Sequence, residues 1–384
     1  MDFALDEQQV MVRDMVRSFA EERLRPGAME RDRSGEFPRE IFAEMGELGL
    51  LGMFVPEEYG GAGMDLLSYL LTVEELARVD ASVAVGMSVT NSVCCYPILT
   101  FGTEEQKRRY LPELATGRVI GGFMLTEPGA GSDAASLRTR YRDGGDHWVL
   151  DGSKAWITNA GVGRYFVCLA TRDPELGPKG ISAFILDAEQ DGVVVNRPEE
   201  KMGLRSSKTA MVGLEGARVP KDAMLGAEGE GFKVALATLD HSRLGIAAQA
   251  VGIAQAALEE ALRYARDRRQ FGRPILEHQA IAFRLAEMDT EIAAARALLW
   301  HAAWIAGRPG RHSRESARAK LYASEMCNRV VGWAVQIHGG YGYSREYTVE
   351  RLYRDARVTT IYEGTSEVQK LVIARSLARE AEGL

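Results

Sequence analysis

Residues 361–369, which read IYEGTSEVQ, place a carboxylate where it could move a proton. Glu363 lies beside Gly364, just ahead of a predicted helix start. Ser366 and Gln369 have the spacing of a capping box at that start. A carboxylate held where a loop meets a helix can act as a general base. The alternative is an acidic residue that only complements the helix dipole, and these residues alone favour neither interpretation.

Four further motifs follow one another along the chain. They are LTEPGAGSD at residues 125–133, WIT at 156–158, RRQFG at 268–272 and QIHGGYG at 336–342. With residues 361–369, this ordered set of five resembles the acyl-CoA dehydrogenase family, which desaturates acyl-CoA thioesters with a bound flavin, and the resemblance begins at PEEYGG, residues 56–61. Each motif alone is a weak signal, whereas five in order over one chain are a strong one. The resemblance runs essentially from end to end.

The resemblance implies FAD-dependent α,β-dehydrogenation of a short- to medium-chain acyl-CoA to the trans-2-enoyl-CoA. Glu363 is then the catalytic base that takes the α-proton, while the β-hydrogen leaves as hydride to flavin N5. Some family members carry this glutamate at the position of Ser242. Because this chain has serine there, Glu363 is left as the candidate for the catalytic base. Similarity over residues 239–252 and 363–369 favours the short-chain members. Candidates for the floor of the acyl pocket lie on a predicted helix over residues 82–99: Met87, Thr90, Asn91, Cys94 and Cys95.

The resemblance also implies contacts for the cofactor and the substrate. The residues expected to bind FAD are Phe123, Leu125, Thr126, Gly131, Ser132, Trp156, Ile157, Thr158, Arg268, Gln270, Phe271, Gln279, Gln336, Gly339, Gly340, Thr365 and Glu367. The acyl-CoA is expected to contact Ser132, Asp240, Arg243 and Gly364. Thr126 and Thr158 would offer hydrogen bonds to the isoalloxazine ring, with Trp156 beside it.

The resemblance implies partners as well. An electron-transfer flavoprotein is the expected electron acceptor. Residues 268–272 and 336–340 are expected to reach FAD across a subunit interface, so that a monomer cannot complete the site. We therefore expect a homo-oligomer, specifically a tetramer. The alternatives are an acyl-CoA oxidase or flavin monooxygenase on the same fold, which rapid aerobic formation of hydrogen peroxide would favour, and a binding protein that has lost the cofactor.

Residues 129–134 also satisfy G-x-G-x-x-A, the dinucleotide-binding fingerprint. A Rossmann turn must open a helix, whereas residues 137–150 have a strand-like pattern with a turn at 143–145. We therefore expect glycines that let backbone amides approach an extended ligand closely.

Four arginines, at positions 263, 266, 268 and 269, end a predicted long helix. They could simply complement the helix dipole. The Gln-Phe-Gly that follows favours a contact with pyrophosphate, because Arg presents bidentate donors to phosphate. His338 is expected to be packed or bonded to solvent rather than to bind a ligand.

The composition excludes other classes of protein. The 384 residues are 46% hydrophobic and 26% charged, which is typical of a soluble globular protein of two or three packed units. A net charge of −7 indicates no nucleic-acid surface. The six His and four Cys have no metal-site or disulfide spacing, so we expect no metal and reduced, buried thiols. The lack of a targeting segment or long apolar run predicts a cytoplasmic protein without membrane insertion.

The elements that must position these residues fall into three groups, and the fold class predicted is α+β. An N-terminal α-helical domain covers residues 1–118, a central antiparallel β-barrel or sheet domain 119–227, and a C-terminal four-helix-bundle domain 228–384. The strands expected include residues 148–150, 165–170, 181–186 and 193–195. The long helices expected cover residues 234–266, 276–305 and 315–337. The family has the same order of helical, β and helical domains.

Overall fold

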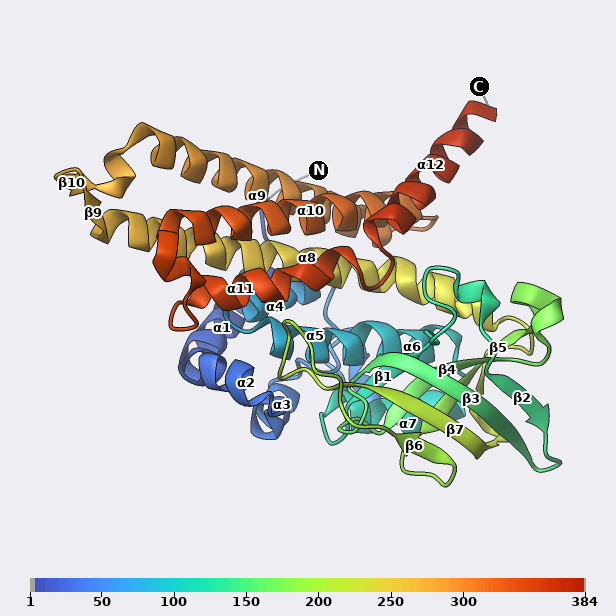
Figure 1. Ribbon diagram of the computed structural model, residues 1–384. Coiled ribbons are helices and arrows are strands. Elements are labelled where there is room, and N and C mark those ends of the chain that lie inside the picture. The colour runs from blue at the N-terminus through green and yellow to red at the C-terminus, as the bar shows by residue number, and fades with distance from the viewer. Residues whose placement is uncertain (1–3, 383–384) are drawn as a thin grey trace.

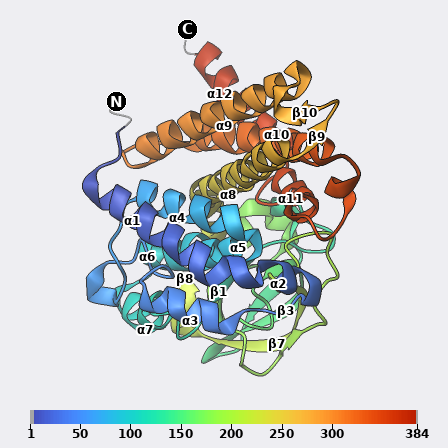
Figure 2. The ribbon, with the colours of Figure 1, turned by 90° about the vertical axis from the view of Figure 1, so that its left-hand side faces the viewer.

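The computed structural model describes residues 4–382. Three long helices lie side by side along one side of the molecule, and the N-terminal helices and a β-sheet share the opposite side (Figures 1 and 2). This is the predicted order of a helical, a β and a second helical part. The fold class is therefore confirmed.

The N-terminal part is helical. Its helices are α1 (Glu7–Phe19), α2 (Ala28–Ser34), α3 (Arg39–Glu47), α4 (Leu66–Val79), α5 (Ala81–Val89), α6 (Tyr96–Phe101) and α7 (Glu104–Ala115). Asp6 and Thr103 form the predicted capping boxes of α1 and α7, and Asp65 caps α4. Side-chain acceptors at these positions satisfy amides that a helix leaves unpaired.

A buried helical stretch joins α5 to α6 through a π-helical turn, η4 (Thr90–Cys95). Among the described residues this stretch, Ala81–Phe101, is long and apolar enough to cross a membrane, but 83% of its apolar window is buried inside the protein. It contains the five residues proposed above for the floor of the acyl pocket. Four of them donate hydrogen bonds to backbone carbonyls inside the protein. Asn91 Nδ2 donates to Leu50 O at 2.8 Å and Thr90 Oγ1 to Gly86 O at 3.1 Å, and the thiols of Cys94 and Cys95 donate to Tyr165 O and Leu51 O.

The central part is a sheet. Its strands are β1 (Gly121–Met124), β2 (Arg140–Asp143), β3 (His147–Thr158), β4 (Tyr165–Thr171), β5 (Ile181–Asp187), β6 (Val193–Val195), β7 (Thr209–Pro220) and β8 (Met224–Leu225). Their order is β6-β7-β3-β2-β4-β5-β8, with β1 also paired to β4. Most pairings are antiparallel as predicted, whereas β1 and β2 each run parallel to β4. Both reach β4 through connections longer than a hairpin, as parallel pairs require.

Residues of β4 and β5 are buried on both faces of the sheet. Tyr165, Val167 and Leu169 pack toward the helices, while Phe166 and Cys168 pack toward β3 and β7. Alternation of side chains along a strand separates these two apolar clusters. The sheet is thus anchored to the helices on one side and folds over its own core on the other.

The C-terminal part contains α8 (Gly231–Asp267), α9 (Gln279–Ala306), α10 (Ser313–His338), α11 (Thr348–Ala356) and α12 (Ser366–Glu382), with a small hairpin of β9 (Arg269–Gln270) and β10 (Arg273–Pro274). Helices α8, α9 and α10 pack as a bundle, and many of the residues that α8 buries are alanines. Small side chains let helix axes approach closely. Helix α12 extends away from the body of the molecule (Figure 1), and of its residues only Ser366 and Gln369 are buried.

Candidate active site

Glu363 lies in the loop between a short helical turn, η10 (Arg357–Thr360), and α12. Its φ is 50°, in the left-handed region that residues other than glycine rarely adopt. Ser242, on α8, donates a hydrogen bond from Oγ to Glu363 Oε2 at 2.6 Å. The carboxylate predicted as the base is therefore turned toward the long helix and held there by a hydroxyl.

The N-cap of the helix that follows, α12, lies one residue earlier than predicted. The predicted capping box with Ser366 as N-cap is wrong, because Thr365 Oγ1 accepts from Val368 N at 3.3 Å and Ser366 is already helical. Ser366 is buried, and its Oγ donates to Glu325 Oε1, on α10, at 2.6 Å. The Ser366 hydroxyl therefore bonds to a residue of α10 instead of capping α12. Gln369, the other residue of the predicted capping box, bonds to the carbonyls of Glu363 and Gly364 instead.

Burial and charge set the protonation of Glu363. Burial raises the pKa of this carboxyl, while the Ser242 hydrogen bond and the charges of Lys320 and Arg243 offset part of that rise. The net shift is upward, toward the pH range in which a general base works best. The environment of Glu363 thus suits a group that takes a proton.

Two predicted substrate contacts lie on the same helix. Arg243 Nη1 lies 3.0 Å from Asp240 Oδ1, so the pair predicted from the sequence is formed. Arg243 is buried, and among the described residues its Nε has no hydrogen-bond partner. A buried donor without a partner is costly unless a ligand supplies an acceptor. Arg243 therefore fits a role in binding a polar group of the substrate.

The central motifs are brought together by the sheet. Ala155 N donates to Thr126 O at 2.9 Å, which sets residues 125–133 beside the end of β3. Trp156 has a φ of 60°, and its side chain is 62% exposed. Among the described residues, five non-glycine residues have positive φ, and Trp156, Phe271 and Glu363 are three of them. Backbone strain of this kind concentrates at functional sites.

Two residues that hold these motifs were not predicted. Lys154 is fully buried and pairs with Glu127 at 2.7 Å. Asn159 has a φ of 66°, and its Nδ2 donates to Gly86 O at 3.1 Å and to Gly121 O at 2.8 Å. The end of β3 is thereby tied to α5 and β1. A lysine at a core-facing strand position was the signal in the sequence for the first of them.

Two predicted cofactor contacts, Thr365 and Glu367, lie beside Glu363 at the start of α12, whereas another group lies at the far end of α8. Arg268, Gln270 and Phe271 lie in and beside the hairpin of β9 and β10, Gln279 begins α9, and Gln336, Gly339 and Gly340 lie at the end of α10. Between Ser242 and Asp267 run 25 residues of one helix, which is about 37 Å. Figure 1 shows the hairpin well away from the sheet. One chain therefore does not bring this group together with Glu363.

The far group is exposed. Phe271 is 94% exposed, and the Arg268 guanidinium lies 5.7 Å from the centre of the Tyr341 ring. Gln336 lines an open hollow of about 530 Å³ together with Trp333 and Tyr353. His338, in contrast, is buried, and its Nδ1 lies 2.8 Å from Ala334 O, so of the two expected environments it has the packed one.

The residues present fit a large planar cofactor with a phosphate tail. A Cβ built on Gly129, Gly131 or Gly340 would meet nothing within 4 Å, so the packing of this chain does not require glycine there. Close approach of an external group to the backbone explains such glycines. The segment after Gly131 forms a short 3-10 turn (Ala134–Ser136) and then β2, which excludes a Rossmann turn. The described residues hold no cluster of His, Cys, Asp or Glu suited to a metal ion, and the four cysteines are buried.

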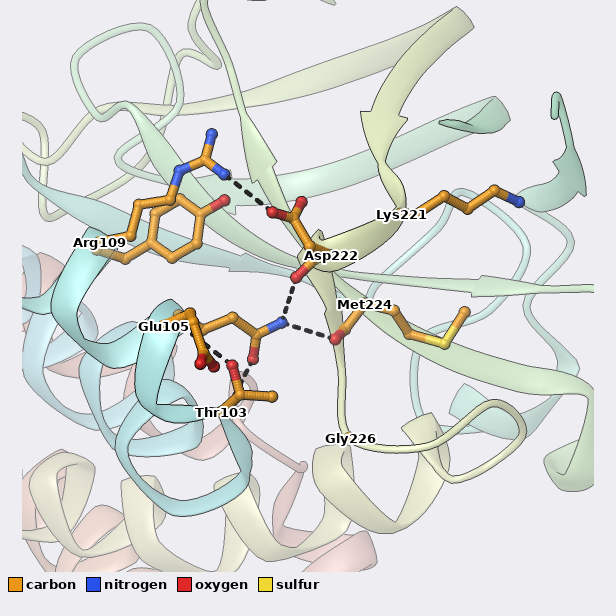
Figure 3. A pocket seen from close by; sticks show the side chains of 9 residues that line it. Thr103, Glu105, Arg109, Lys221, Asp222, Met224 and Gly226 are labelled. Atoms are coloured by element: carbon orange, nitrogen blue, oxygen red, sulfur yellow. Dashed lines mark hydrogen bonds and ion pairs between the residues drawn. The ribbon is translucent and has the colours of Figure 1, made fainter. Parts of the chain in front are cut away.

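A separate cavity lies between α7 and the turn that joins β7 to β8 (Figure 3). Its volume is about 460 Å³, and Arg109 Nη1 lies 3.4 Å from Asp222 Oδ2 at its wall. None of the residues predicted for the cofactor or the substrate lines it. The residues that do are Thr103, Glu105, Gln106, Arg109, Tyr110, Lys221, Asp222, Met224 and Gly226.

Comparison with known proteins adds independent findings. Residues 6–118, 122–217 and 229–378 match the family models described as the N-terminal, middle and C-terminal domains of acyl-CoA dehydrogenase. The short-chain specific acyl-CoA dehydrogenase of Clostridium acetobutylicum is 47% identical, over 99% of this chain and 100% of its own.

Solved structures agree with this. The butyryl-CoA dehydrogenase of Megasphaera elsdenii is 44% identical, with a TM-score of 0.97, over 98% of this chain and 100% of that one. An acyl-CoA dehydrogenase of Bacillus anthracis complexed with FAD is 35% identical, with a TM-score of 0.93, over 99% of this chain and 68% of that one.

Proposed function

The chain belongs to the acyl-CoA dehydrogenase family, and on that premise we propose that it desaturates a short-chain acyl-CoA with Glu363 as the base. It is an FAD-dependent oxidoreductase that acts on acyl-CoA. The observation that carries the assignment of the base is the geometry of Glu363. Its carboxylate is turned by a strained backbone toward Ser242 and carries a raised pKa.

The chain's own residues at the site have separate proposed roles in holding the base, the substrate and the cofactor. Ser242 holds Oε2 of Glu363, which leaves the other carboxylate oxygen to take the α-proton. Arg243 offers a buried donor to the substrate. Thr126, Trp156 and Thr158 would hold the isoalloxazine ring of FAD, and Arg268 the pyrophosphate. When bound, FAD supplies the acceptor for the β-hydrogen as hydride.

A polar bridge beside the base supports a short acyl chain. The hydroxyl of Tyr362, the residue before Glu363, hydrogen-bonds with Gln249 Oε1, and Gln249 Nε2 donates to Ala81 O at 3.0 Å. Gln249 is buried on α8, and Ala81 begins α5. The bridge therefore spans the interior between α8, α5 and the loop of the base. If the acyl chain extends past Glu363 into this interior, a long chain would have to displace the bridge.

We expect butyryl-CoA to reduce the bound flavin faster than octanoyl-CoA. Replacing Gln249 with Ala removes the bridge and opens space for added methylenes, so kcat/KM for octanoyl-CoA relative to butyryl-CoA should rise about tenfold or more. Loss of the visible absorbance of oxidised flavin, followed anaerobically, measures both values. Gln255→Ala, on the same helix but bonded to Glu259, is the matched control and should leave the ratio unchanged.

The same experiment separates the alternatives. A wild-type protein that prefers octanoyl-CoA would contradict the short-chain proposal. Failure of every acyl-CoA to reduce bound flavin would contradict dehydrogenation itself. Rapid formation of hydrogen peroxide from acyl-CoA and oxygen would favour an oxidase, whereas reduced flavin that is reoxidised only by an electron-transfer flavoprotein supports the dehydrogenase with that acceptor.

We also propose a homo-oligomer, with a tetramer as the expected size, in which each site takes Arg268 from a second subunit. Support comes from the separation of about 37 Å along α8 and from the exposure of Phe271 at its far end. Two groups of one chain that lie this far apart cannot both contact the same FAD, so they belong to different sites.

This arrangement predicts complementation. Glu363→Gln and Arg268→Ala should each be nearly inactive alone, because one lacks the base and the other a phosphate contact. When the two variants are refolded or expressed together, about a quarter of the sites should combine an intact Glu363 with an intact Arg268. Turnover of butyryl-CoA, with light scattering to establish the oligomer, measures the recovery. No recovery in mixed oligomers would show that each site is built within one chain.

A further inference from the structure

Lys320 is a buried cation that the reaction described above does not use. It lies on α10 with 0% of its surface exposed. Its Nζ donates to the carbonyl of Gly364, the residue after Glu363, at 2.7 Å. Burying an ammonium is costly, so a lysine at this position needs a reason.

A second donor acts on the same segment. Gln369 is fully buried in the first turn of α12, and its Nε2 donates to Gly364 O at 2.9 Å and to Glu363 O at 3.3 Å. The Glu363 carbonyl is therefore held by α12 alone, and the Gly364 carbonyl is held by α12 and α10 together. This explains why Gln369 does not complete a capping box.

The segment so held is strained. Glu363 has a φ of 50° and Gly364 a φ of 91°, two left-handed residues in succession. A left-handed conformation of a residue other than glycine costs roughly 1–3 kcal/mol and persists only where surrounding contacts over-determine it. In this conformation the Glu363 side chain meets Ser242 Oγ. Lys320 Nζ and Gln369 Nε2 supply contacts to the backbone carbonyls of the segment.

We propose that Lys320 is a positioning residue for the reaction: by holding the Gly364 carbonyl it keeps Glu363 in the conformation that presents its carboxylate to the substrate. The inference rests on the proposed function, because it requires Glu363 to be the base. Lys320 acts through Glu363 and is not itself expected to touch the reacting atoms.

Charge supports the geometry. Burial lowers the pKa of Lys320 to about 8 against the opposing charge of Glu363, so at neutral pH the side chain is mostly an ammonium. The charged and titratable groups near Glu363 are Lys320 from α10, Arg243 from α8, Tyr69 from α4 and the adjacent Tyr362. Near Lys320 they are Glu363, Arg243, Glu325 and Glu367. Removing the Lys320 charge leaves Arg243 as the remaining cation that lowers the pKa of Glu363.

The test is Lys320→Met, which keeps the length of the side chain and removes the donor and the charge. We expect kcat for butyryl-CoA to fall about 10- to 100-fold, because misplacing a catalytic group by an ångström has effects of this size. KM should change little. The acid limb of the pH profile of kcat should move to higher pH by about one unit, because the carboxylate loses a nearby cation. Lys320→Arg, which keeps a donor and a charge, should restore most of the activity and the profile.

Arg351→Met is the matched control. Arg351 is also a buried cation that donates to a backbone carbonyl, Val79 O, at 2.8 Å, but from α11 and away from Glu363. Its loss should lower stability without moving the pH profile. If Lys320→Met behaves in the same way, Lys320 is structural and the inference is overturned.

Glu363→Gln, measured in parallel, separates this inference from the proposed function. If Glu363→Gln turns over butyryl-CoA at nearly the wild-type rate, Glu363 is not the base, and the inference fails with it. An inactive Glu363→Gln together with an unaffected Lys320→Met overturns the inference alone. Should Lys320→Met fail to fold or to retain FAD, Lys320→Gln keeps a donor without the charge. Because its side chain is one bond shorter than that of lysine, its amide falls short of the Gly364 carbonyl. It must then lower kcat with KM little changed, and an unchanged kcat overturns the inference.

Discussion

Glu363→Gln is expected to retain FAD and to lose turnover of butyryl-CoA by about 10²- to 10⁴-fold, the range that a positioned general base contributes. The amide keeps the shape of the side chain, and its oxygen can still accept from Ser242 Oγ. It cannot take the α-proton. Stopped-flow measurement of flavin reduction reports the chemical step directly, since binding and reoxidation are separated from it.

The matched control for this variant is Glu346→Gln, an exposed carboxylate ahead of α11. It should leave the rate of flavin reduction unchanged. The raised pKa of Glu363 also gives the wild-type rate an acid limb, which should be absent from the residual rate of Glu363→Gln. A variant that reduced its flavin at the wild-type rate would demote Glu363 to a structural carboxylate.

The second large effect is expected at Lys154, where replacement by Met should destabilise the fold by about 3–5 kcal/mol. Lys154 is fully buried, and its partner Glu127 is nearly so. The Glu127 carboxylate also accepts from Arg138 N at 2.6 Å and Thr139 N at 3.0 Å, so it cannot leave its place. Without Lys154 a buried charge remains unpaired beside Thr126. Urea unfolding monitored together with flavin release measures both losses.

The pH dependence has a definite sign. In the wild type, burial opposes ionisation of Glu127 but Lys154 and the hydrogen bonds lower its pKa overall, so its contribution to stability is present above the ordinary pKa of a glutamate and is lost as the pH falls below it. In Lys154→Met the cation is gone and burial dominates, so the variant should recover stability as the pH falls. Lys233→Met, at an exposed pair with Glu230, should change stability by no more than about 0.5 kcal/mol. Equal losses in the two variants would contradict this account.

What the sequence predicted well was local. The caps of α1, α4 and α7 and the extent of the long helices depend on neighbours along the chain, and the structure has them. The cap of α12 was predicted one residue late, because Ser366 bonds to Glu325, which lies 41 residues away. The parallel pairing of β1 with β4 is likewise a long-range choice. Periodicity carries no information on either.

The candidate site divides in the same way. The motifs identified Glu363 and the segments around Thr126 and Trp156, whose roles at the cofactor stay predictions. Lys320 and Gln249 were missed because each is one polar residue on an otherwise apolar helix face, and only the fold reveals what it meets. A charged residue at a core-facing position of α10 was the one local signal for Lys320. The division of the chain after residues 118 and 227 also stays a prediction.

Helix α8 has 37 residues, and the 25 that follow Ser242 run unbroken from the neighbourhood of Glu363 to the hairpin that carries Phe271. If the hairpin serves a neighbouring subunit, the number of residues in the helix sets the distance between adjacent flavins. Each added residue would advance the hairpin by about 1.5 Å and turn it by about 100°. Length changes within α8 are therefore far less tolerable than changes of side chain, and a family that keeps this assembly has little freedom to vary the length of its longest helix.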